Sequence, residues 1–330
     1  MSTRPGVALP GTVTMREAER LTAEAEAAGA ASVWVSDVRR EPYLACAAAL
    51  GATTRVTVGT DVAVAFARTP AATAQAAWDL AGYSSGRFIL GLGSQVGPTL
   101  LSRFGVELDR PAARLRDYVR AVRACWSAYR AGRGRYEGDF YSVRQPVFSP
   151  GADDPWPGVP LYVAGVNPVM VAIAGEVADG FAAHMFCTAR YLEAVIRPAL
   201  ARGAARAGRT PPPVLMPIVV GRDRASLAMQ MTTYSVPAYR RVLDESGFAD
   251  EADAILAALA ERRRTVAARI IEERCLDELG VVLLADLDRG VERWRAHADV
   301  VGLSVPWYGL DHAEQIALFR DVLHALERMP

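Results

Sequence analysis

The amino-acid sequence predicts an α/β fold in which eight parallel strands and their helices close into a (β/α)8 barrel, or TIM barrel. Its 330 residues are 51% hydrophobic and can bury one large core. Eight short apolar runs are each followed by a segment of helical periodicity. No Asn-Gly hairpin signal joins neighbouring runs, which favours parallel strands. An open, doubly wound sheet stays an alternative, because periodicity counts strands without showing closure.

We expect a single domain over residues 1–330, with insertions that connect the regular units. They fall near 96–110, 131–160 and 224–275. Residues 131–160 are rich in Gly, Pro, Asp and aromatics, with a small extended piece near Phe140 and Tyr141. Residues 224–275 are helical and highly charged.

The first half of the chain contains four strand-then-helix units. Strands are predicted at 7–9, 33–35, 56–61 and 88–90 from their apolar runs. Helix starts follow these strands: Thr14-x-x-Glu17 is a capping box, Pro42 suits a first helical turn, and Thr69 caps ahead of Pro70. A long amphipathic helix from Pro111 follows the fourth strand.

The second half repeats the alternation. Strands are predicted at 161–164, 181–183, 214–220 and 300–305. Helices are expected at 169–178, from about 185 to 208, over 224–275, and in a final segment that Asp311 caps.

Composition removes several classes of function. The formal net charge is zero, so neither nucleic acid nor an anionic membrane is expected as a partner. All 37 basic residues are arginine, which excludes a Schiff-base lysine and a Walker-type phosphate loop. No apolar run reaches about 18 residues and no signal region opens the chain, so we expect a cytoplasmic protein.

The cysteines and histidines give no metal signature. Cys46, Cys125, Cys187 and Cys275 stand far apart without a Cys-x-x-Cys pair, which indicates buried thiols. Four histidines without His-x-x-x-His spacing make a protein-ligated metal unexpected.

In a parallel barrel, ligands bind at the carboxyl ends of the strands. This rule gathers scattered stretches into one candidate ring: Pro10, Asp37, Asp61, Gly93 to Gln95, Gly165 to Asn167, His184, Gly221 and Trp307. Asp37 and His184 follow apolar strands directly and are the candidate acid/base residues. Asp37 could equally cap a segment, and a lone histidine is more often structural.

Two glycine-containing stretches suggest ligand contacts. Gly91-Leu92-Gly93-Ser94-Gln95-Val96-Gly97 resembles a dinucleotide fingerprint, but its third glycine comes one position late and no helix follows at once. A flavin-like ligand or plain tight packing is therefore favoured over a nicotinamide dinucleotide. Gly165-Val166-Asn167-Pro168 opens a helix whose free N–H groups would attract a phosphate, or it is simply a helix start with nothing bound.

Several motifs, in order, resemble the bacterial luciferase-like flavin and deazaflavin oxidoreductases. They are Arg68-Thr69-Pro70, the stretch Ser84 to Leu92 with its Ser-x-Gly-Arg-Phe motif, Pro160 to Val166, and Ala174 to Gly180 ending in Ala-Asp-Gly. Gly91 to Gln95, His184-x-Phe186 and Ala238-Tyr239-Arg240 look most like the actinobacterial branch that uses coenzyme F420.

The resemblance implies a luciferase-like barrel and a place for each part of the cofactor. The phosphate end of F420 would meet Gly165, Val166 and Asn167. Its ring would lie over the third and fourth strands, and so beside Asp61, Val62, Gly91, Gly93, Ser94 and Gln95. The resemblance also implies a non-proline cis peptide at Asp61-Val62 and a homodimer formed through the outer helices.

The implied activity is hydride transfer between F420 and a small organic substrate. One alternative of the same fold is a monooxygenase using reduced FMN from a partner reductase; others are a non-catalytic cofactor-binding barrel and a barrel without a redox cofactor. Sugar-phosphate members carry an acid near the position of Gln95, and glutamine cannot titrate. Proton transfer would then fall to His184, to Asp37 or to water, with His184 the better pKa match near neutrality.

Overall fold

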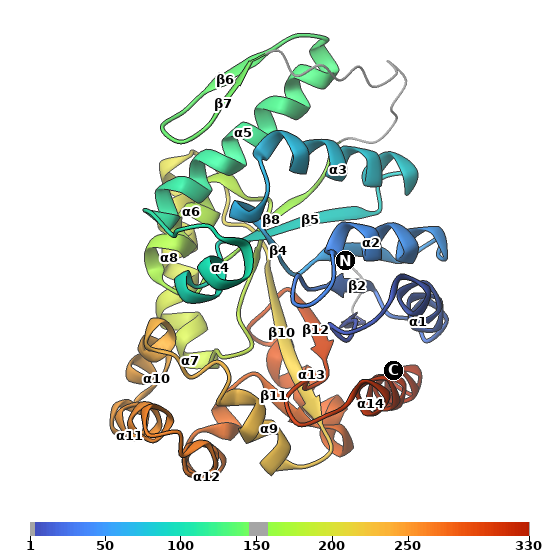
Figure 1. Ribbon diagram of the computed structural model, residues 1–330. Helices are drawn as coiled ribbons and strands as arrows, with labels where there is room; N and C mark the ends of the chain where they lie inside the picture. The colour runs from blue at the N-terminus through green and yellow to red at the C-terminus, as the bar shows by residue number, and fades with distance from the viewer. Residues whose placement is uncertain (1–3, 145–157, 330) are drawn as a thin grey trace.

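Eight parallel strands close into a barrel in this computed structural model, which describes residues 4–144 and 158–329. Pairing of β9 with β10 and of β12 with β1 completes the ring, so the open-sheet alternative is wrong and the TIM barrel is confirmed (Figure 1). In order around the barrel, the strands are β1 (Gly6–Ala8), β2 (Ser32–Val35), β3 (Thr57–Thr60), β5 (Phe88–Gly93), β8 (Leu161–Ala164), β9 (Gly180–Ala182), β10 (Val214–Gly221) and β12 (Val300–Ser304).

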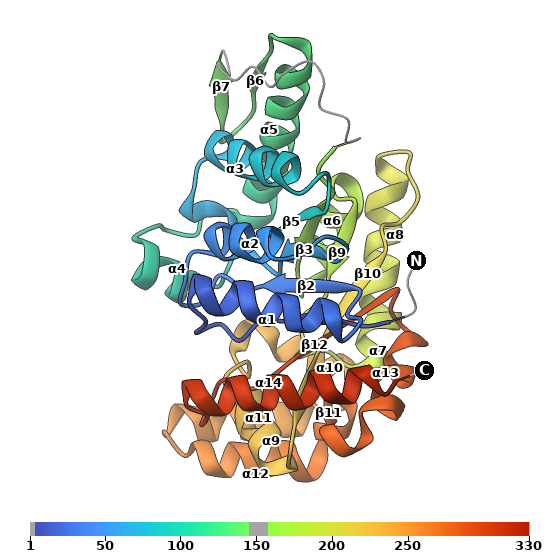
Figure 2. The same ribbon diagram turned by 90° about the vertical axis from the view of Figure 1, so that its right-hand side faces the viewer.

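Helices surround the barrel, and Figure 2 shows α1, α2 and α3 stacked along one flank with α14 beyond α1. Thr14 and Glu17 form the predicted capping box, Thr69 accepts a hydrogen bond from the Ala72 N–H, and Asp311 caps the last helix. The outer helices are α1 (Met15–Ala27), α2 (Pro42–Gly51), α3 (Pro70–Tyr83), α5 (Pro111–Ala131), α6 (Pro168–Val177), α7 (Ala189–Tyr191), α8 (Arg197–Arg206), α13 (Leu287–Arg295) and α14 (His312–Glu327).

The strands bury both faces. Residues that point outward, such as Val33 and Val58, pack against the helices in the main core. Residues that point inward fill the barrel, where the Trp34 and Tyr162 rings lie 5.9 Å apart beside Ala8, Ala182 and Leu215. Because side chains alternate along a strand, these inward positions show which residues at the strand ends face the mouth of the barrel.

The first two insertions differ in structure. Residues 96–110 contain a short helix, α4 (Gly97–Phe104). The described part of 131–160 forms an antiparallel hairpin of β6 (Arg135–Glu137) and β7 (Ser142–Arg144), while residues 145–157 lie outside the described residues. The small extended piece that the sequence predicts near Phe140 and Tyr141 is this hairpin, in which these two residues lie in the turn. Asp117 of α5 explains this, because its carboxylate accepts hydrogen bonds from both of their N–H groups, at 2.8 and 3.0 Å.

The third insertion is helical as predicted and lies beside β10 (Figure 1). A 3-10 turn at Pro237–Tyr239 interrupts it, and the strand β11 (Val281–Leu283), which the sequence analysis misses, follows it and pairs with β10. A further short strand, β4 (Ala63–Val64), pairs with β5. The helices are α9 (Arg224–Met231), α10 (Arg240–Ser246), α11 (Ala249–Ala260) and α12 (Arg264–Arg274).

The Ser-x-Gly-Arg-Phe motif has a structural role. The Arg87 guanidinium donates hydrogen bonds to the carbonyl oxygens of Leu50, Thr53 and Val56 and to the Thr53 hydroxyl. These contacts satisfy carbonyl groups where α2 ends. The motif therefore secures the α2–β3 connection at the end of the barrel away from the strands' carboxyl termini.

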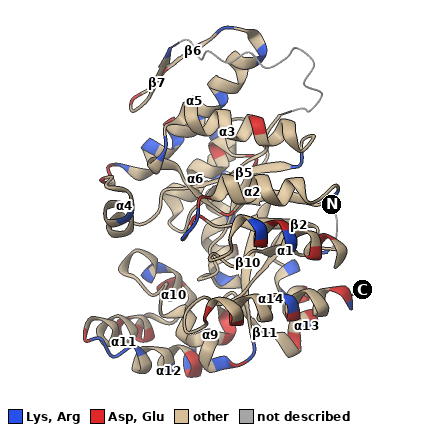
Figure 3. Ribbon diagram, turned by 45° about the vertical axis from the view of Figure 1, so that its right-hand side comes forward, with Lys and Arg blue, Asp and Glu red and all other residues tan. Residues whose placement is uncertain are grey.

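The surface carries mixed charge, with basic and acidic side chains interspersed on the outer helices (Figure 3). All four cysteines are free and buried, as predicted. Within residues 4–144 and 158–329, no helix is long and apolar enough to cross a membrane.

Candidate functional site

Closure of the barrel brings the predicted ring of strand-end residues to one mouth. Asp61 lies two residues beyond Gly59, where a β-carbon would touch the inward-facing Trp34 ring, so Asp61 faces the same side. His184 likewise lies two residues beyond the inward-facing Ala182. Between β3 and β9 stand β5 and β8, where Ala164 pairs with Ala182 and a β-carbon on Gly93 would stand 3.8 Å from that of Ala164. Two titratable side chains thus flank a strip of small residues.

Hydrogen bonds hold the backbone of Asp61, whereas its carboxylate makes none with the described residues. Its N–H donates to the Val35 carbonyl at 2.9 Å, and its carbonyl accepts from the Ser36 hydroxyl at 2.8 Å. No residue in the described ranges hydrogen-bonds to the carboxylate or pairs with it. Burial raises the pKa of this carboxyl from 3.8 to about 7. The sequence predicts that Asp61 lies beside a cofactor, but it does not predict the raised pKa. This pKa depends on burial of the carboxyl group without a partner.

The peptide bond between Asp61 and Val62 is cis, as the resemblance implies. Val62 lies over the strip of small residues: a β-carbon on Gly93 would stand 2.7 Å from a Val62 methyl group. A β-carbon on Gly91 would come within 1.9 Å of the Thr60 carbonyl oxygen. Both glycines belong to β5, so the predicted end of this strand at residue 90 is too early. They are required by close packing of β5 on β3, whatever binds above them.

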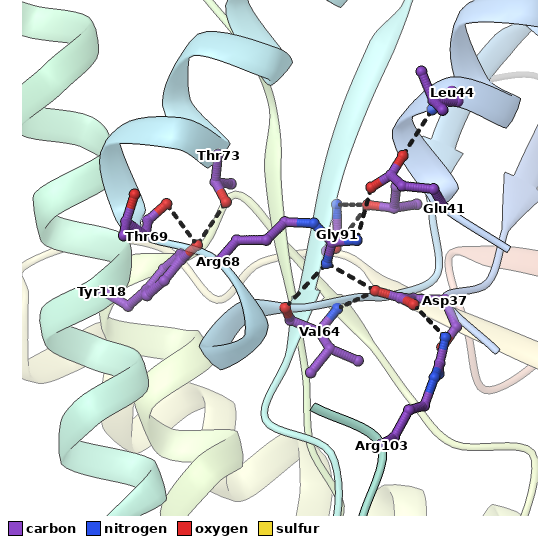
Figure 4. A network of polar contacts seen from close by, with 11 residues as sticks. Asp37, Glu41, Leu44, Val64, Arg68, Thr69, Thr73, Gly91, Arg103 and Tyr118 are labelled. Carbon is purple, nitrogen blue, oxygen red and sulfur yellow. Dashed lines mark hydrogen bonds and ion pairs between the residues drawn. The ribbon is translucent and has the colours of Figure 1, made fainter. Parts of the chain in front are cut away.

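Asp37 is enclosed by cations (Figure 4). Its carboxylate accepts a hydrogen bond from Arg68 at 2.9 Å and one from Arg103 of α4 at 2.8 Å, and the Val64 N–H donates a third at 3.2 Å. The Asp37 side chain is only 2% exposed. Two ion pairs and a backbone contact favour a role in positioning the α4 segment over the proton transfer suggested from sequence.

His184 sits in an aromatic cage. Its ring centroid lies 4.8 Å from those of Tyr234 and Tyr239, two residues of the third insertion. Burial lowers the pKa of His184 from 6.5 to about 4, so the expected match to neutral pH is wrong. The Nδ1 atom accepts a hydrogen bond from the Phe186 N–H at 3.0 Å. The neutral ring therefore carries its proton on Nε2 and can act as a hydrogen-bond donor.

Gln230, which is fully buried in α9, organises the side of the mouth opposite Asp61. Its carbonyl oxygen accepts from the N–H groups of Trp307 and Tyr308, both at 2.9 Å. Its amide nitrogen donates to the Tyr234 hydroxyl at 3.0 Å. Gln230 thereby ties the loop after β12 to the cage around His184. Sequence reasoning identifies Trp307 but gives no signal for Gln230 or Tyr234, which lie within a long helical pattern.

The turn after β8 leaves the first N–H groups of α6 without a side-chain cap. Asn167 occupies the N-cap position, yet its amide donates to the Ala238 carbonyl at 3.2 Å instead. A β-carbon on Gly165 would lie 2.8 Å from Met170, which explains the small residue, and the Val166 carbonyl accepts from the Tyr191 hydroxyl. The helices α1 and α3 are capped by Thr14 and Thr69, so α6 differs from them.

Ser94 and Gln95 turn the chain away from β5. Gln95 has a left-handed backbone, with φ of 61°, and its side-chain oxygen accepts from the Val96 N–H at 3.0 Å. The Ser94 hydroxyl donates to the Gln95 carbonyl at 3.1 Å. Both side chains are therefore engaged locally in shaping the loop to α4.

A metal site and a surface groove are two other kinds of site that the structure allows us to assess. Within residues 4–144 and 158–329, no group of three or more His, Cys, Asp or Glu residues could hold a metal ion. A surface groove of about 550 Å³ lies between α9 and α12, where its lining arginine Arg224 already pairs with Asp277. This groove is separate from the mouth and shares none of its lining residues.

Comparisons with known proteins support the same fold. An uncharacterized protein of Mycobacterium tuberculosis is 39% identical over 232 residues, which are 66% of this chain and 68% of that protein. A second protein of that species, named "Putative coenzyme F420-dependent oxidoreductase", is 28% identical over 331 residues, covering 90% of this chain and 91% of the relative.

Two solved structures share the architecture. The coenzyme F420-dependent tetrahydromethanopterin reductase from Methanopyrus kandleri has a TM-score of 0.78 at 18% identity, over 99% of this chain and 98% of its own. An F420-dependent secondary alcohol dehydrogenase has a TM-score of 0.70 at 19% identity, over 98% and 99%. The model of the family described as luciferase-like monooxygenase matches residues 1–299. The chain therefore belongs to the luciferase-like monooxygenase family.

Proposed function

We propose that this protein is an oxidoreductase that transfers a hydride between coenzyme F420 and a small organic substrate. The observation that carries the proposal is the strip of small residues, Gly93 and Ala164, between Asp61 and His184 at the mouth of the barrel. A flat ring needs such a floor, and hydride transfer needs proton-active or hydrogen-bonding groups at its edge.

The residues of the mouth fit such a cofactor. The uncapped start of α6, with Gly165, Val166 and Asn167, offers N–H groups to a phosphate. Across the barrel, Asp61, Val62 and Gly91 border the floor that Gly93 and Ala164 form, and the turn at Ser94 and Gln95 limits it. Relatives and structural neighbours whose names specify F420 support this choice of cofactor.

The cofactor supplies the chemistry of accepting or returning a hydride, and the chain supplies orientation and polarity. Neutral His184 can donate its Nε2–H to a substrate oxygen, because Nδ1 already accepts from the Phe186 N–H. Its low pKa keeps it a donor rather than a base at neutral pH. The cage of Tyr234 and Tyr239 limits access of water to that side of the mouth.

A reduced-FMN monooxygenase is the second candidate, and the family's description as luciferase-like monooxygenase favours it. It would require a partner reductase. The two candidates differ in their reaction with oxygen, because a reduced deazaflavin does not form the oxygen adduct that a reduced flavin forms. Stopped-flow mixing of the protein and each reduced cofactor with oxygenated buffer therefore tests the proposal. Consumption of oxygen with reduced FMN, and an absence of F420 binding, would favour the monooxygenase.

A cofactor-binding barrel without catalysis is the remaining candidate. It would be supported if purified protein bound F420 but gave no turnover with any alcohol or ketone, and if His184→Ala left that result unchanged. We further propose that the protein forms a homodimer through its outer helices, which light scattering coupled to size-exclusion chromatography tests directly.

A further inference from the structure

We propose that Asp61 is the residue that takes and returns the proton that accompanies the hydride. This inference rests on the proposed function. It assigns the acid/base role to the residue that follows β3, next to β5, whose outgoing loop contains Gln95.

The placement of Asp61 supports this role. Asp61 directly follows β3 at the carboxyl end of the barrel, and the bonds from Asp61 N–H to the Val35 carbonyl and from the Ser36 hydroxyl to the Asp61 carbonyl fix its backbone there. Asp61 is half-buried as a residue, and its carboxylate has no hydrogen-bond or ion-pair partner among the described residues. A carboxyl group that stands on a fixed backbone at the strand end and has no partner is available to a bound substrate.

The groups on neighbouring elements leave Asp61 without a competitor for this role. From β2, Asp37 is engaged by Arg68 and Arg103. From β5, Gly93 has no side chain, and Ser94 and Gln95 do not titrate near neutrality. From β9, His184 stays neutral because its pKa is lowered to about 4. Burial raises the pKa of Asp61 to about 7, so both of its protonation states are populated where cells operate.

The proposed step applies to substrates with a hydroxyl or carbonyl group. In the oxidative direction the substrate C–H bond breaks and its electron pair leaves with the hydrogen as hydride, to the F420 cofactor. The O–H bond breaks as the C=O bond forms, and its proton passes to the Asp61 carboxylate. In the reductive direction the Asp61 carboxyl group returns this proton to the oxygen. The substrate is oxidised by two electrons and the cofactor is reduced by two.

The test compares wild-type protein with Asp61→Asn and with a matched control, Asp79→Asn. Asp79 lies on the outer helix α3, where burial also raises its carboxyl pKa. F420 binding is measured first by fluorescence titration. Oxidation of 2-propanol and cyclohexanol by F420, and reduction of the two ketones by reduced F420, are then followed between pH 5.5 and 8.5.

We expect all three proteins to bind F420. Asp61→Asn should lower kcat by about 100-fold or more, the usual range for loss of a general acid or base, and should remove the ionisation near pH 7 from the kcat profile. Asp79→Asn should keep both the rate and the profile.

Three results would overturn the inference. If Asp61→Asn keeps kcat within about threefold, or keeps the ionisation near pH 7, another group carries the proton. If wild-type protein binds F420 but turns over none of these alcohols and ketones, the inference fails while the cofactor assignment stands. If wild-type protein does not bind F420, the proposed function fails and the inference fails with it.

Discussion

Arg103 of α4 donates one hydrogen bond to the Asp37 carboxylate, at 2.8 Å, and a second to the Asp37 carbonyl oxygen, at 2.6 Å. The two residues are 66 positions apart in the sequence. This double contact ties α4 to the residue that follows β2, and Figure 4 shows Arg68 and Arg103 both directed at the Asp37 carboxylate.

Asp37→Ala should lower the free energy of unfolding by about 3 kcal/mol, because it leaves the partly buried Arg103 without a counter-ion and Arg68 with Glu41 alone. Urea denaturation measures the change. Asp109→Ala is the matched control, since Asp109 pairs with Arg110 in the same segment but both side chains are more than 60% exposed. We expect no measurable change for the control. Equal stabilities of wild type and Asp37→Ala would show that the network contributes nothing.

Asp61→Asn should stabilise the free protein above neutral pH. The pKa of Asp61 is raised in the folded state, so folding favours the protonated acid, and that contribution is lost as the pH rises through about 7. An uncharged asparagine avoids the loss. At pH 8 the variant should exceed wild type by up to about 4 kcal/mol, the equivalent of a shift of three pKa units. At pH 4 the difference should be much smaller. Thermal unfolding across this range measures it, and a variant that is less stable at pH 8 would contradict the titration.

His184 should remain neutral down to about pH 5. Its folded-state pKa is lowered, so the stability linked to the neutral ring is complete above the unfolded pKa of about 6.5 and is lost as the pH falls toward 4. The chain has four histidines. The ring resonance that is present in NMR spectra of wild type and absent from those of His184→Gln belongs to His184. The wild-type His184 resonance should not shift between pH 8 and pH 5. Titration of this resonance near pH 6.5 would show that the aromatic cage does not exclude water.

Gln230→Leu should cost about 3 kcal/mol of stability, because the backbone N–H groups of Trp307 and Tyr308 lose their acceptor. Hydrogen exchange at these two amides should accelerate. Gln75→Leu on the exposed face of α3 is the control and should change neither measurement. Unchanged amide protection in Gln230→Leu would mean that the loop after β12 is held by other contacts.

The sequence predicts the scaffold well because its signals are local. The Thr14 capping box, the Asp311 cap and the alternation of apolar runs with helical segments each lie within a few residues, and the structure contains them. β11 is missed because its three residues adjoin helical segments. β5 is predicted too short because glycines read as a loop, whereas Gly91 and Gly93 are needed for contact with Thr60 and Val62.

The candidate site is predicted in position but not in chemistry. The structure places Asp37, Asp61 and His184 just beyond the carboxyl ends of β2, β3 and β9, as the sequence predicts. Their protonation depends on contacts made by residues far away in the chain: Arg103 pairs with Asp37, and Tyr234 covers His184. A sequence pattern does not show such contacts. It also does not show that Asp61 has no partner in the described structure.

The central claim is that the mouth of this barrel binds F420, and a titration of the protein with each cofactor tests it most directly. Thermal unfolding is measured with increasing F420 and, separately, with increasing FMN. We predict stabilisation by F420 that reaches about 2.7 kcal/mol at a hundred times its Kd, with no comparable effect of FMN at the same concentrations. Stabilisation by FMN alone, or by neither cofactor, would contradict the account.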